Sequence, residues 1–595
     1  MFCFLQVFCS LFSGLLLSAA IPNEFLKLGN PLLALVALVP LYIAITRSRS
    51  FKGAFWCCFL HGGFTHLLSS FWLGNFQGFA AFTLGASLVG TAFIEGFVGL
   101  FIYLPFAKRQ LTQNSGANFL IPLRIFSFSA VYVIYEWCKS TGFLAYPWGT
   151  LSMTMYRWPV IMQIADITGP YGVSFFLALI NSTIAEGLLE FNSIVKKSDK
   201  TAQASSYIQV LKAVACLTLA VLCYGSYQMA KERTPVKYMN TVMVQQNLDT
   251  YNSNENEGIR ISQNLTEDGI KELKNQDLST DLVVWSEGVL GKNFPRAEKY
   301  YDKFPRPVPL ISFIKKQKVP FIIGGSKTID EEKHQYGNVA ILFNKLGRVE
   351  GSYIKLHLVP FAEAIPFVEY PAMRKLVKKI AGFSYGWTAG KKYTLFEIPV
   401  SDLDVVDTEP VEIISLTTPP AKKKPTVMVS TPICFDDAFA HVCRGLFLSG
   451  SEVFMNITND SWSKKESSEY QHFVVSSYRA IEYRTTLARC TNSGYSVVVG
   501  PDGRIQKDCP LFVEDYVAER IPVYQRVITT YAKFGDWVAY ASLLFLFVFV
   551  IFEFNYEKTH TVTEISTELV KTRRRKTSGT TGRTPKSSKD TKSSK

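Results

Sequence analysis

Three short runs of strand-forming residues each lead to one ionisable side chain. Residues 426–429 precede Cys434 in the stretch STPICFDD, residues 282–285 precede Glu287, and residues 351–354 precede Lys355. A thiol, a carboxylate and an ammonium group held at strand ends can act as nucleophile, base and charge stabiliser. Taken singly, each has an ordinary explanation, because most cysteines are small buried apolar residues and strand-end glutamates and lysines are often solvated. Together the three predict a catalytic site.

The chemistry that suits these three groups is acyl transfer. A free thiol is mostly protonated at neutral pH, so Cys434 needs a base, and Glu287 can take its proton. Lys355 can stabilise the thiolate and the oxyanion that forms when the thiolate attacks a carbonyl carbon. The resulting thioester keeps the acyl group reactive toward an amine. This reaction requires neither a metal ion nor an organic cofactor, and the chain has no CxxC or Cys/His spacing typical of zinc sites.

The order Glu287, Lys355, Cys434 is that of the nitrilase superfamily. The surrounding sequence motifs are specific to a smaller family within it. They are VVWSE, YIKLHLVPFAEAIP, ICFDDAF, NITNDSW, YQHFVVSSYRAIEYRTTLARCTNSGYS and GPDGRI. Together these words resemble the apolipoprotein N-acyltransferases, membrane-embedded enzymes that act last in bacterial lipoprotein maturation. The resemblance spans roughly residues 1 to 555 and does not rest on one motif.

The resemblance implies a fold and a reaction. The fold is a multispanning α-helical membrane domain joined to an extracytoplasmic α/β domain, a nitrilase-like αββα sandwich of two packed sheets with helices outside. The reaction is ping-pong, through a triad of Glu287, Lys355 and Cys434. Cys434 would take an acyl chain from a membrane phospholipid and pass it to the α-amino group of the diacylglyceryl N-terminal cysteine of an apolipoprotein. The motifs do not specify which phospholipid or which lipoproteins are used.

The resemblance also implies supporting or substrate-binding roles for residues around the triad: Glu363, Phe435, Asp436, Trp462 and Trp148. Glu363 is expected to orient Lys355. Trp148 lies in the aromatic loop TGFLAYPWGT, which either anchors the membrane interface or lies near the entry of lipid. The chain departs from the family where Phe435-Asp436 replaces Tyr-Glu, Trp-Ser-Glu replaces Trp-Pro-Glu, and Ser463-Lys464 replaces the Phe-Gly that follows the tryptophan in Trp-Phe-Gly. These departures bear on selectivity more than on chemistry, and His472 and Arg479 are expected to be structural.

Long apolar runs in the first 230 residues and near the C-terminus predict about eight membrane segments. They lie at about residues 2–21, 30–46, 52–74, 79–107, 118–138, 161–187, 208–228 and 537–554. Several approach the roughly 20 apolar residues that a bilayer requires. The first run ends in Ser-Ala-Ala, as a cleaved signal peptide does. An uncleaved helix is favoured because no basic residue precedes the run and further membrane segments follow.

Loop charges orient these segments. With a cytoplasmic N-terminus, the cytoplasmic loops hold ten basic residues: Arg47, Arg49, Lys52, Lys108, Arg109, Arg124, Lys196, Lys197, Lys200 and Lys212. The opposite loops hold three: Lys27, Lys139 and Arg157. Seven crossings before residue 229 then place the following domain outside the cytoplasm. In a bacterium with two membranes that is the periplasmic face of the inner membrane, with the C-terminal tail in the cytoplasm.

The predicted domains are a membrane domain over 1–228, a catalytic domain over 229–536, a membrane helix over 537–555 and a basic tail over 556–595. Strand-like runs alternate with helix-like stretches such as 473–487 in the catalytic domain, which argues for a layered α/β fold. These runs are 241–244, 282–285, 321–323, 339–343, 453–457 and 496–499. Residues 401–425 are typical of an exposed loop insertion.

The net charge bears on which macromolecules the chain could bind, and the cysteines bear on whether it forms a disulfide. The formal charge is +14, but residues 571–595 hold ten Lys or Arg and one acid, so about +9 belongs to the tail. A nucleic-acid partner is therefore not predicted. The tail composition predicts disorder and is compatible with contact to anionic lipid headgroups. A disulfide within the soluble part, among Cys443, Cys490 and Cys509, is left open.

Two other functions compete with acyl transfer to a lipoprotein. One is a membrane-tethered nitrilase-like amidase with water as acceptor. The other is a non-enzymatic scaffold or transporter with a degenerate domain. The intact triad argues against the second, and a transporter typically has intramembrane charges and paired broken helices. Against the amidase, a diacylated acceptor needs a lipid-accessible site, whereas a soluble amide does not.

Overall fold

The structure is a computed structural model that describes residues 3–76, 80–107, 120–195, 201–252, 254–364, 386–401 and 425–553, together with 370–372, 374–375 and 379. Residues Met1–Tyr540 form one compact unit, and Ala541–Lys595 form a second. Several predictions lie outside the described residues. They concern the loop insertion at 402–424, the basic tail at 556–595, and the loop residues Lys108, Arg109, Lys196, Lys197 and Lys200. The predicted domain boundaries stay predictions.

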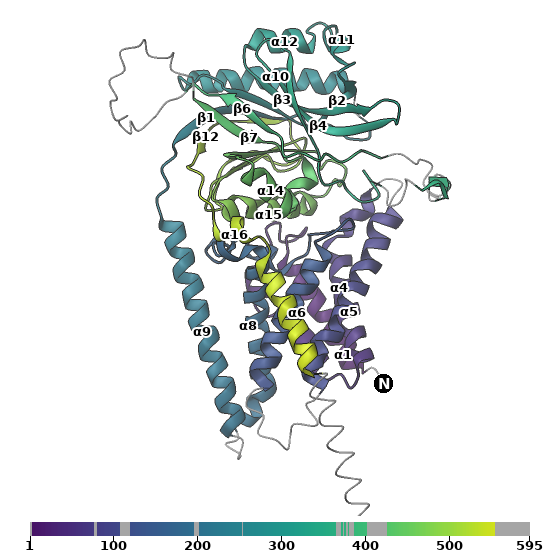
Figure 1. The fold of residues 1–595 in the computed structure, drawn as a ribbon, viewed down its shortest axis with the longest axis vertical. Coiled ribbons are helices and arrows are strands. Elements are labelled where there is room, and N and C mark those ends of the chain that lie inside the picture. Colours follow the sequence, from purple (N-terminus) through teal and green to yellow (C-terminus); the bar gives the residue numbers. More distant parts are fainter. Residues whose placement is uncertain are drawn as a thin grey trace, which may run out of the picture. The chain divides into compact units, whose positions relative to one another are not determined.

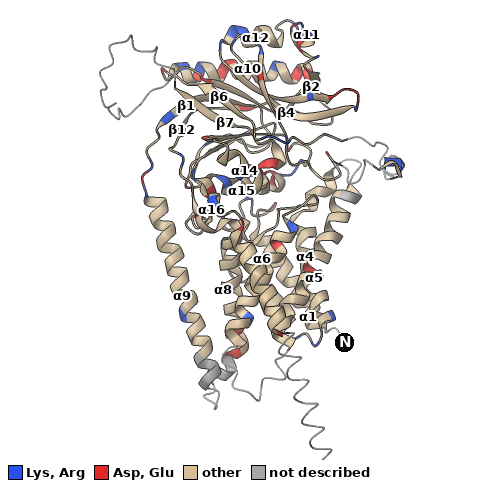
Figure 2. Cartoon of the chain, in the orientation of Figure 1, with Lys and Arg blue, Asp and Glu red and all other residues tan. Residues whose placement is uncertain are grey.

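The N-terminal part of the chain is helical, with few charged residues along its helices (Figure 2). Its longer helices are α1 (Phe4–Ala20), α3 (Val39–Thr46), α4 (Phe51–Ser69), α5 (Ser87–Ala107), α6 (Leu120–Lys139), α8 (Ala165–Val195) and α9 (Thr201–Ala230). Shorter turns are α2 (Pro31–Ala34), η1 (Phe71–Asn75), η2 (Ala81–Ala86), η4 (Leu151–Met155) and α7 (Pro159–Met162).

Four helices among the described residues are long and apolar enough to cross a membrane: Thr83–Ala107, Leu120–Lys139, Ala165–Glu190 and Ser206–Ala230. Three shorter apolar helices cover Phe4–Ala20, Pro31–Thr46 and Trp537–Glu553. All eight predicted segments thus overlap helices, but the number that crosses the bilayer stays a prediction.

The second predicted segment is interrupted between α2 and α3. Asn181 of α8 bridges the break, because its Oδ1 accepts from the Leu38 amide at 2.8 Å and its Nδ2 donates to the Ala34 carbonyl oxygen at 2.8 Å. These two bonds replace helical bonds that an apolar environment would otherwise leave unsatisfied.

Buried contacts between ionisable side chains also join the membrane-part helices. Arg124 of α6 lies 2.7 Å from Glu186 of α8, and His61 of α4 lies 2.6 Å from Glu95 of α5. Sequence reasoning treated intramembrane charge as a sign of a transporter. Here these charges pair with each other between helices, which is how such groups are tolerated at membrane depth.

The rest of the compact unit consists of two six-stranded sheets with helices on their outer faces (Figure 1). The first sheet has the order β12 (Asp515–Val523), β1 (Lys237–Gln245), β2 (Leu282–Phe294), β3 (Phe321–Asp330), β4 (Gln335–Phe343) and β5 (Val349–Ile354). The second has the order β11 (Ile505–Asp508), β10 (Val497–Val499), β9 (Thr486–Thr491), β8 (Val453–Thr458), β7 (Thr426–Ser430) and β6 (Leu395–Pro399). The predicted layered α/β fold is confirmed.

Packing in this fold follows from the sequence pattern. β1 pairs in parallel with β2, and β2 with β3; likewise β7 pairs in parallel with β8, and β8 with β9. These central strands are rich in apolar residues because both of their faces are buried. The helices α10 (Glu255–Asn275), α11 (Glu298–Tyr301) and α12 (Leu310–Gln317) cover the first sheet, and α14 (Ala440–Leu448) and α15 (Glu466–Tyr483) cover the second (Figure 1). Between the sheets, the Cys490 thiol contacts the Val244 and Val284 carbonyl oxygens at 3.3 Å each.

The helix predicted over 473–487 is wrong at its C-terminal end. The helix α15 ends at Tyr483, where Arg484 adopts a left-handed conformation with φ of 49°. The chain then enters β9, whose six residues are all buried and pair in parallel with β8. Residues 486 and 487 therefore join β9 instead of the helix, because they pair with β8. Local periodicity in the sequence cannot reveal this pairing.

Candidate active site

The three candidate catalytic residues line one cavity of about 800 Å³. Glu287 lies in β2, Lys355 follows β5, and Cys434 begins the short 3-10 turn η5 (Cys434–Ala438) after β7. The first two come from one sheet and the third from the other. Lys355 Nζ lies 3.5 Å from Glu287 Oε1.

Cys434 sits on a sharp turn. Its φ is +47°, a left-handed conformation that non-glycine residues rarely adopt and that tends to occur at functional sites. Asp436 holds this turn, because its carboxylate accepts from the Ile433 amide at 3.1 Å, the His357 amide at 2.7 Å and the Tyr353 hydroxyl at 2.8 Å. The bonds tie the turn to the end of β5, so Asp436 links the elements that carry the thiol and the lysine.

Lys355 is held by carboxylates. Its side chain is 1% exposed, and its Nζ lies 2.8 Å from Glu363 Oε2 in addition to the longer contact with Glu287. Burial would lower the pKa of Lys355, but Glu363, Cys434 and Glu287 outweigh burial and raise the pKa well above its ordinary value. The lysine is therefore a fixed positive charge. Glu363 also accepts from the Val359 amide at 2.9 Å, so its own position is set by the backbone.

Glu287 is a buried carboxylate with both oxygens engaged. Oε1 accepts from Asn338 Nδ2 at 2.7 Å, and Oε2 accepts from the Asn459 amide at 2.8 Å. Burial raises the pKa of Glu287, and Lys355 opposes this rise. The neighbouring strand must approach closely: a Cβ at Gly324 of β3 would lie 2.4 Å from the Ser286 carbonyl oxygen and 2.5 Å from Glu287 Cα. Glycine at this position lets β3 support the glutamate.

A second group of charges lies beside the thiol. The ligand atoms of Cys434, Asp460 and His472 lie within 4.8 Å of one another. Both imidazole nitrogens are engaged, Nδ1 at 2.9 Å from Asp460 and Nε2 at 3.1 Å from Asp437. These contacts favour a hydrogen-bonded ion network over a metal site. Burial raises the pKa of the Cys434 thiol well above its ordinary value, Glu287 raises it further, and Lys355 opposes them.

Aromatic side chains form the wall between the thiol and the membrane part. The Trp148 ring stacks on Phe435 with centroids 5.3 Å apart and planes 13° apart. Trp462 packs against Trp72 at 5.6 Å and Phe76 at 5.1 Å, both in or next to η1. The cavity continues along η2 and α5, where it is lined mainly by small uncharged residues, three of them with hydroxyl groups: Thr83, Ala86, Ser87, Gly90, Thr91 and Ile94. The nucleophile thus shares a cavity with the surface of a membrane-length helix.

The structure brings together every site residue expected from the sequence except Asp436, which lies behind the cavity wall and supports the turn. It adds polar neighbours that sequence reasoning missed, above all Asn338 and Asp460. Asp460 lies in the motif NITNDSW, which could have identified it as a site residue. Asn338 lies in the middle of β4, outside every motif that the sequence analysis used. His472, expected to be structural, lines the cavity. All three thiols considered for a disulfide, Cys443, Cys490 and Cys509, are free.

Comparisons with known proteins place the chain in a family. Residues 13–183 match the family described as apolipoprotein N-acyltransferase N-terminal domain, and residues 245–526 match the family described as carbon-nitrogen hydrolase. The apolipoprotein N-acyltransferase 2 of Treponema denticola is 39% identical over 93% of this chain and 98% of its own length. That of Treponema pallidum is 35% identical over 96% and 99%, and the Borreliella burgdorferi enzyme is 30% identical over 93% and 97%. The chain therefore belongs to the apolipoprotein N-acyltransferase family.

Proposed function

We propose that this protein moves an acyl chain from a membrane phospholipid, through a thioester on Cys434, to the α-amino group of the diacylglyceryl N-terminal cysteine of a lipoprotein. One observation carries the proposal. Glu287, Lys355 and Cys434 meet in a cavity whose other wall belongs to the membrane-length helix Thr83–Ala107. A lipid ester and a lipidated amine can both reach such a site.

In the first half-reaction Glu287 accepts the thiol proton and the Cys434 thiolate attacks the ester carbonyl carbon. The negative charge that develops on the carbonyl oxygen is stabilised by Lys355, whose ammonium is already fixed by Glu363. The C–O bond then breaks, and the departing lysophospholipid alkoxide takes the proton from Glu287. The products are a lysophospholipid and an acyl-Cys434 thioester.

In the second half-reaction the lipoprotein amine attacks the thioester carbonyl carbon. Glu287 takes a proton from the attacking nitrogen, Lys355 again stabilises the oxyanion, and the C–S bond breaks. The thiolate is reprotonated by Glu287, and the product is an amide. Asn338 supports both steps, since it hydrogen-bonds Glu287 at 2.7 Å and Glu363 at 3.2 Å. Trp462, against Trp72 and Phe76, is suited to docking the acceptor.

The orientation belongs to the same proposal. The eight crossings predicted from the sequence and the ten-to-three bias of basic residues counted there support an inner-membrane protein with its α/β domain in the periplasm and its tail in the cytoplasm, although the structure places Arg124 inside α6. Both substrates would then be available there, since the donor lipid and the lipid-anchored acceptor enter from the bilayer.

The test uses purified full-length protein and a phospholipid labelled in its acyl chain. Without acceptor, label should appear on Cys434, be released by hydroxylamine, and move to an added diacylglyceryl peptide. Cys434→Ala should abolish labelling, whereas Cys443→Ala, a buried thiol of α14 outside the cavity lining, should keep it. Equal loss in both variants, or transfer without a trappable thioester, would contradict the scheme.

The match to the carbon-nitrogen hydrolase family favours one competitor, an amidase that uses water as acceptor. The same experiment separates the two. An amidase would release free fatty acid or cleave a soluble amide and leave the diacylglyceryl peptide unlabelled, whereas the proposed enzyme would label the peptide.

A further inference from the structure

A buried lysine lies in the wall of the cavity on its membrane side. Lys139 is the last residue of α6, its side chain is 5% exposed, and it lines the same cavity as Cys434. An ionisable residue at this depth is costly unless it is paired or serves a function.

Lys139 is incompletely partnered among the described residues. Its Nζ donates one hydrogen bond, to the Trp148 carbonyl oxygen at 2.8 Å, and lies 5.4 Å from the centroid of the Tyr135 ring. Two of its three protons have no hydrogen-bond acceptor there. The nearby carboxylates of Glu136 and Glu95 act on it only through longer-range attraction. Each is hydrogen-bonded through Oε1, Glu136 to the Leu151 amide and Glu95 to His61, while its Oε2 has no hydrogen-bond partner among the described residues and makes none with Lys139.

The other basic groups of the cavity lining are already neutralised. Within the part of the chain that the structure describes, these groups are Lys355 and His472. Lys355 contacts Glu287 and Glu363, and His472 contacts Asp437 and Asp460. Lys139 is therefore the basic group left to receive an anion from the cavity.

A second donor without a partner belongs to Trp148, the residue whose backbone carbonyl Lys139 contacts. Trp148 also lines the cavity, and its indole Nε1 is buried with no hydrogen-bond acceptor. The same indole ring stacks on Phe435, the residue after the nucleophile. The Lys139 ammonium and the Trp148 indole N–H are thus two hydrogen-bond donors with free capacity. The Trp148 ring connects them to the turn that carries Cys434 through its contact with Phe435.

The two substrates differ in one chemical group. A donor phospholipid carries a phosphodiester on the same glycerol as its acyl ester, whereas a diacylglyceryl cysteine carries no phosphate. We propose that Lys139, together with the Trp148 indole N–H, binds the phosphate of the donor phospholipid during thioester formation. The assignment rests on the proposed function and names the group by which the site would recognise its donor.

The test compares two donors with the same labelled acyl chains: dipalmitoyl phosphatidylglycerol and dipalmitoylglycerol, which lacks phosphate. Thioester formation on Cys434 is measured in the full-length protein without acceptor. Lys139→Met should slow labelling from phosphatidylglycerol by about tenfold or more, as expected for a lost charge-assisted bond, and change labelling from dipalmitoylglycerol less than about twofold. Lys139→Arg should retain most of the rate.

Controls separate binding of phosphate from support of the loop. Lys27→Met removes an exposed lysine outside the cavity lining and should leave both rates unchanged. Trp148→Phe keeps an aromatic ring, removes the N–H, and should lose rate with phosphatidylglycerol more than with dipalmitoylglycerol. Dihexadecyl phosphate, a phosphodiester without an acyl ester, should inhibit the unmodified protein, which makes the test independent of whether any variant folds.

Equal losses with both donors in Lys139→Met would assign the lysine to holding the Trp148 loop and overturn the proposal. So would an unchanged phosphatidylglycerol rate, or no inhibition by dihexadecyl phosphate. If the unmodified protein forms no thioester from any donor, the proposed function itself fails, and this outcome is distinct from the other three.

Discussion

At the scale of single residues, the site contains two acidic groups, the Cys434 thiol and the Glu287 carboxyl, whose pKa values are both raised. Burial raises the pKa of Cys434 and the pKa of Glu287, while Lys355 opposes both rises. The thiol therefore ionises only when Glu287 accepts its proton close to the lysine. Such coupling suits a nucleophile that must become charged at the moment of attack and remain protonated otherwise.

Removing either charged partner of the thiol should stop the first half-reaction. Glu287→Gln removes the base and should slow thioester formation by roughly 10²- to 10⁴-fold. Lys355→Met removes the oxyanion stabiliser and should slow it by roughly 10²- to 10³-fold. The measurement is the rate of hydroxylamine-sensitive labelling. Glu350→Gln and Lys327→Met, on the same sheet but outside the cavity lining, are matched controls. Comparable losses in the controls would point to a general structural effect.

The histidine beside the thiol makes stability depend on pH. Burial alone would lower the pKa of His472, but Asp460 outweighs burial and, with Asp437 adding to the rise and Arg489 opposing it, the pKa reaches about 9. Because the folded pKa exceeds the ordinary value of 6.5, the charged imidazole contributes stability that is fully present below about pH 6.5 and lost as pH rises through about 9. The size of this contribution is about 3 kcal/mol.

Denaturant unfolding in detergent from pH 6 to pH 10 tests this dependence. The unmodified protein should lose stability between about pH 7 and pH 9.5, and His472→Asn should be less stable at pH 6 and lack this loss. His334→Asn replaces an exposed turn histidine and should behave like the unmodified protein. A flat stability profile of the unmodified protein over this range would contradict the expectation.

At the scale of elements, β2, β5 and β7 position the three catalytic candidates, and the end of a helix connects the α/β part to the membrane part. Arg484, just after α15, donates to Asp166 of α8 at 2.7 and 2.9 Å and to the Gln163 side chain at 2.6 Å. It also donates to the Pro501 carbonyl oxygen at 3.0 Å. One arginine thus fastens the end of α15 to α8 and to the loop at Pro501. Since α15 also carries His472, this contact sets the position of the cavity wall.

Breaking this contact should destabilise the protein more than breaking an exposed pair. Arg484→Gln leaves the buried Asp166 without its charged partner and should lower the free energy of unfolding by about 3 to 5 kcal/mol. Arg504→Gln breaks the more exposed contact with Asp502 and should cost less than about 1 kcal/mol. Denaturant unfolding of both variants in detergent measures the difference. Equal effects would show that the α15–α8 contact adds little.

At the scale of the whole molecule, an apolar helical part and a charged α/β part share one cavity. Lys, Arg, Asp and Glu are sparse along the membrane-part helices and common on the α/β part (Figure 2). The division follows from what each part contacts, since uncompensated charge is costly in lipid. Cys434 therefore shares its cavity with residues of the apolar helix Thr83–Ala107.

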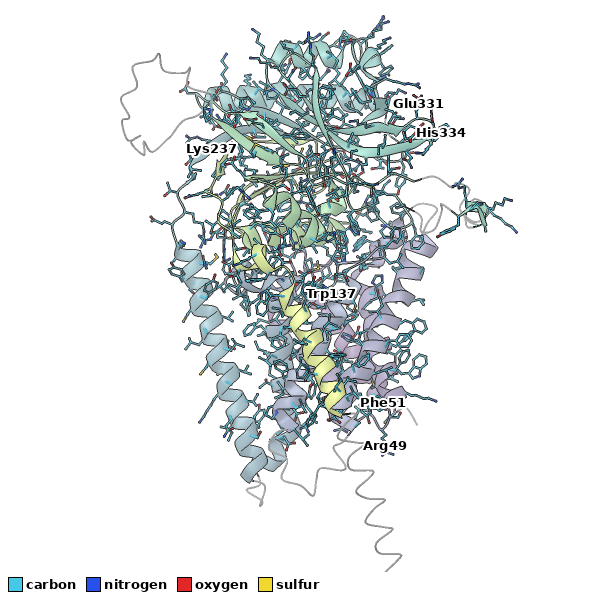
Figure 3. All side chains as sticks on the ribbon, viewed as in Figure 1. Arg49, Phe51, Trp137, Lys237, Glu331 and His334 are labelled. Atoms are coloured by element: carbon cyan, nitrogen blue, oxygen red, sulfur yellow. The ribbon has the colours of Figure 1, made fainter. Side chains whose placement is uncertain are left out.

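The orientation across the membrane can be measured by cysteine labelling. Arg49 and His334 are both exposed and lie at opposite ends of the Met1–Tyr540 unit (Figure 3). In a background without native cysteines, a membrane-impermeant maleimide added to cells with a permeabilised outer membrane should label His334→Cys and not Arg49→Cys. Residue 580, outside the described residues, should behave like Arg49. Labelling of positions 49 and 334 from the same side would overturn the proposed orientation.

Local patterns in the sequence were enough to assign the family, the layered α/β fold and the strands that lead to Lys355 and Cys434, whereas Glu287 lies inside β2, which continues to Phe294 instead of ending before it. These features depend on short-range order: apolar runs form buried strands and helices, and the residue after a strand lies at the edge of its sheet. The apolar runs likewise located the helices of the membrane part, although α2 and α3 divide the second run and β9 displaces the end of a predicted helix.

Only the tertiary structure decided which groups meet. Asn338 joins Glu287 to Glu363 because β4 lies two strands from β2, and His472 lies beside Cys434 because α15 packs against the turn η5. Lys139 counted in the sequence as one basic loop residue, yet in the structure it lies buried in the cavity wall against the Trp148 loop. The reason is physical: a buried charge takes its pKa and its role from neighbours that are distant in the chain, and no local pattern records them.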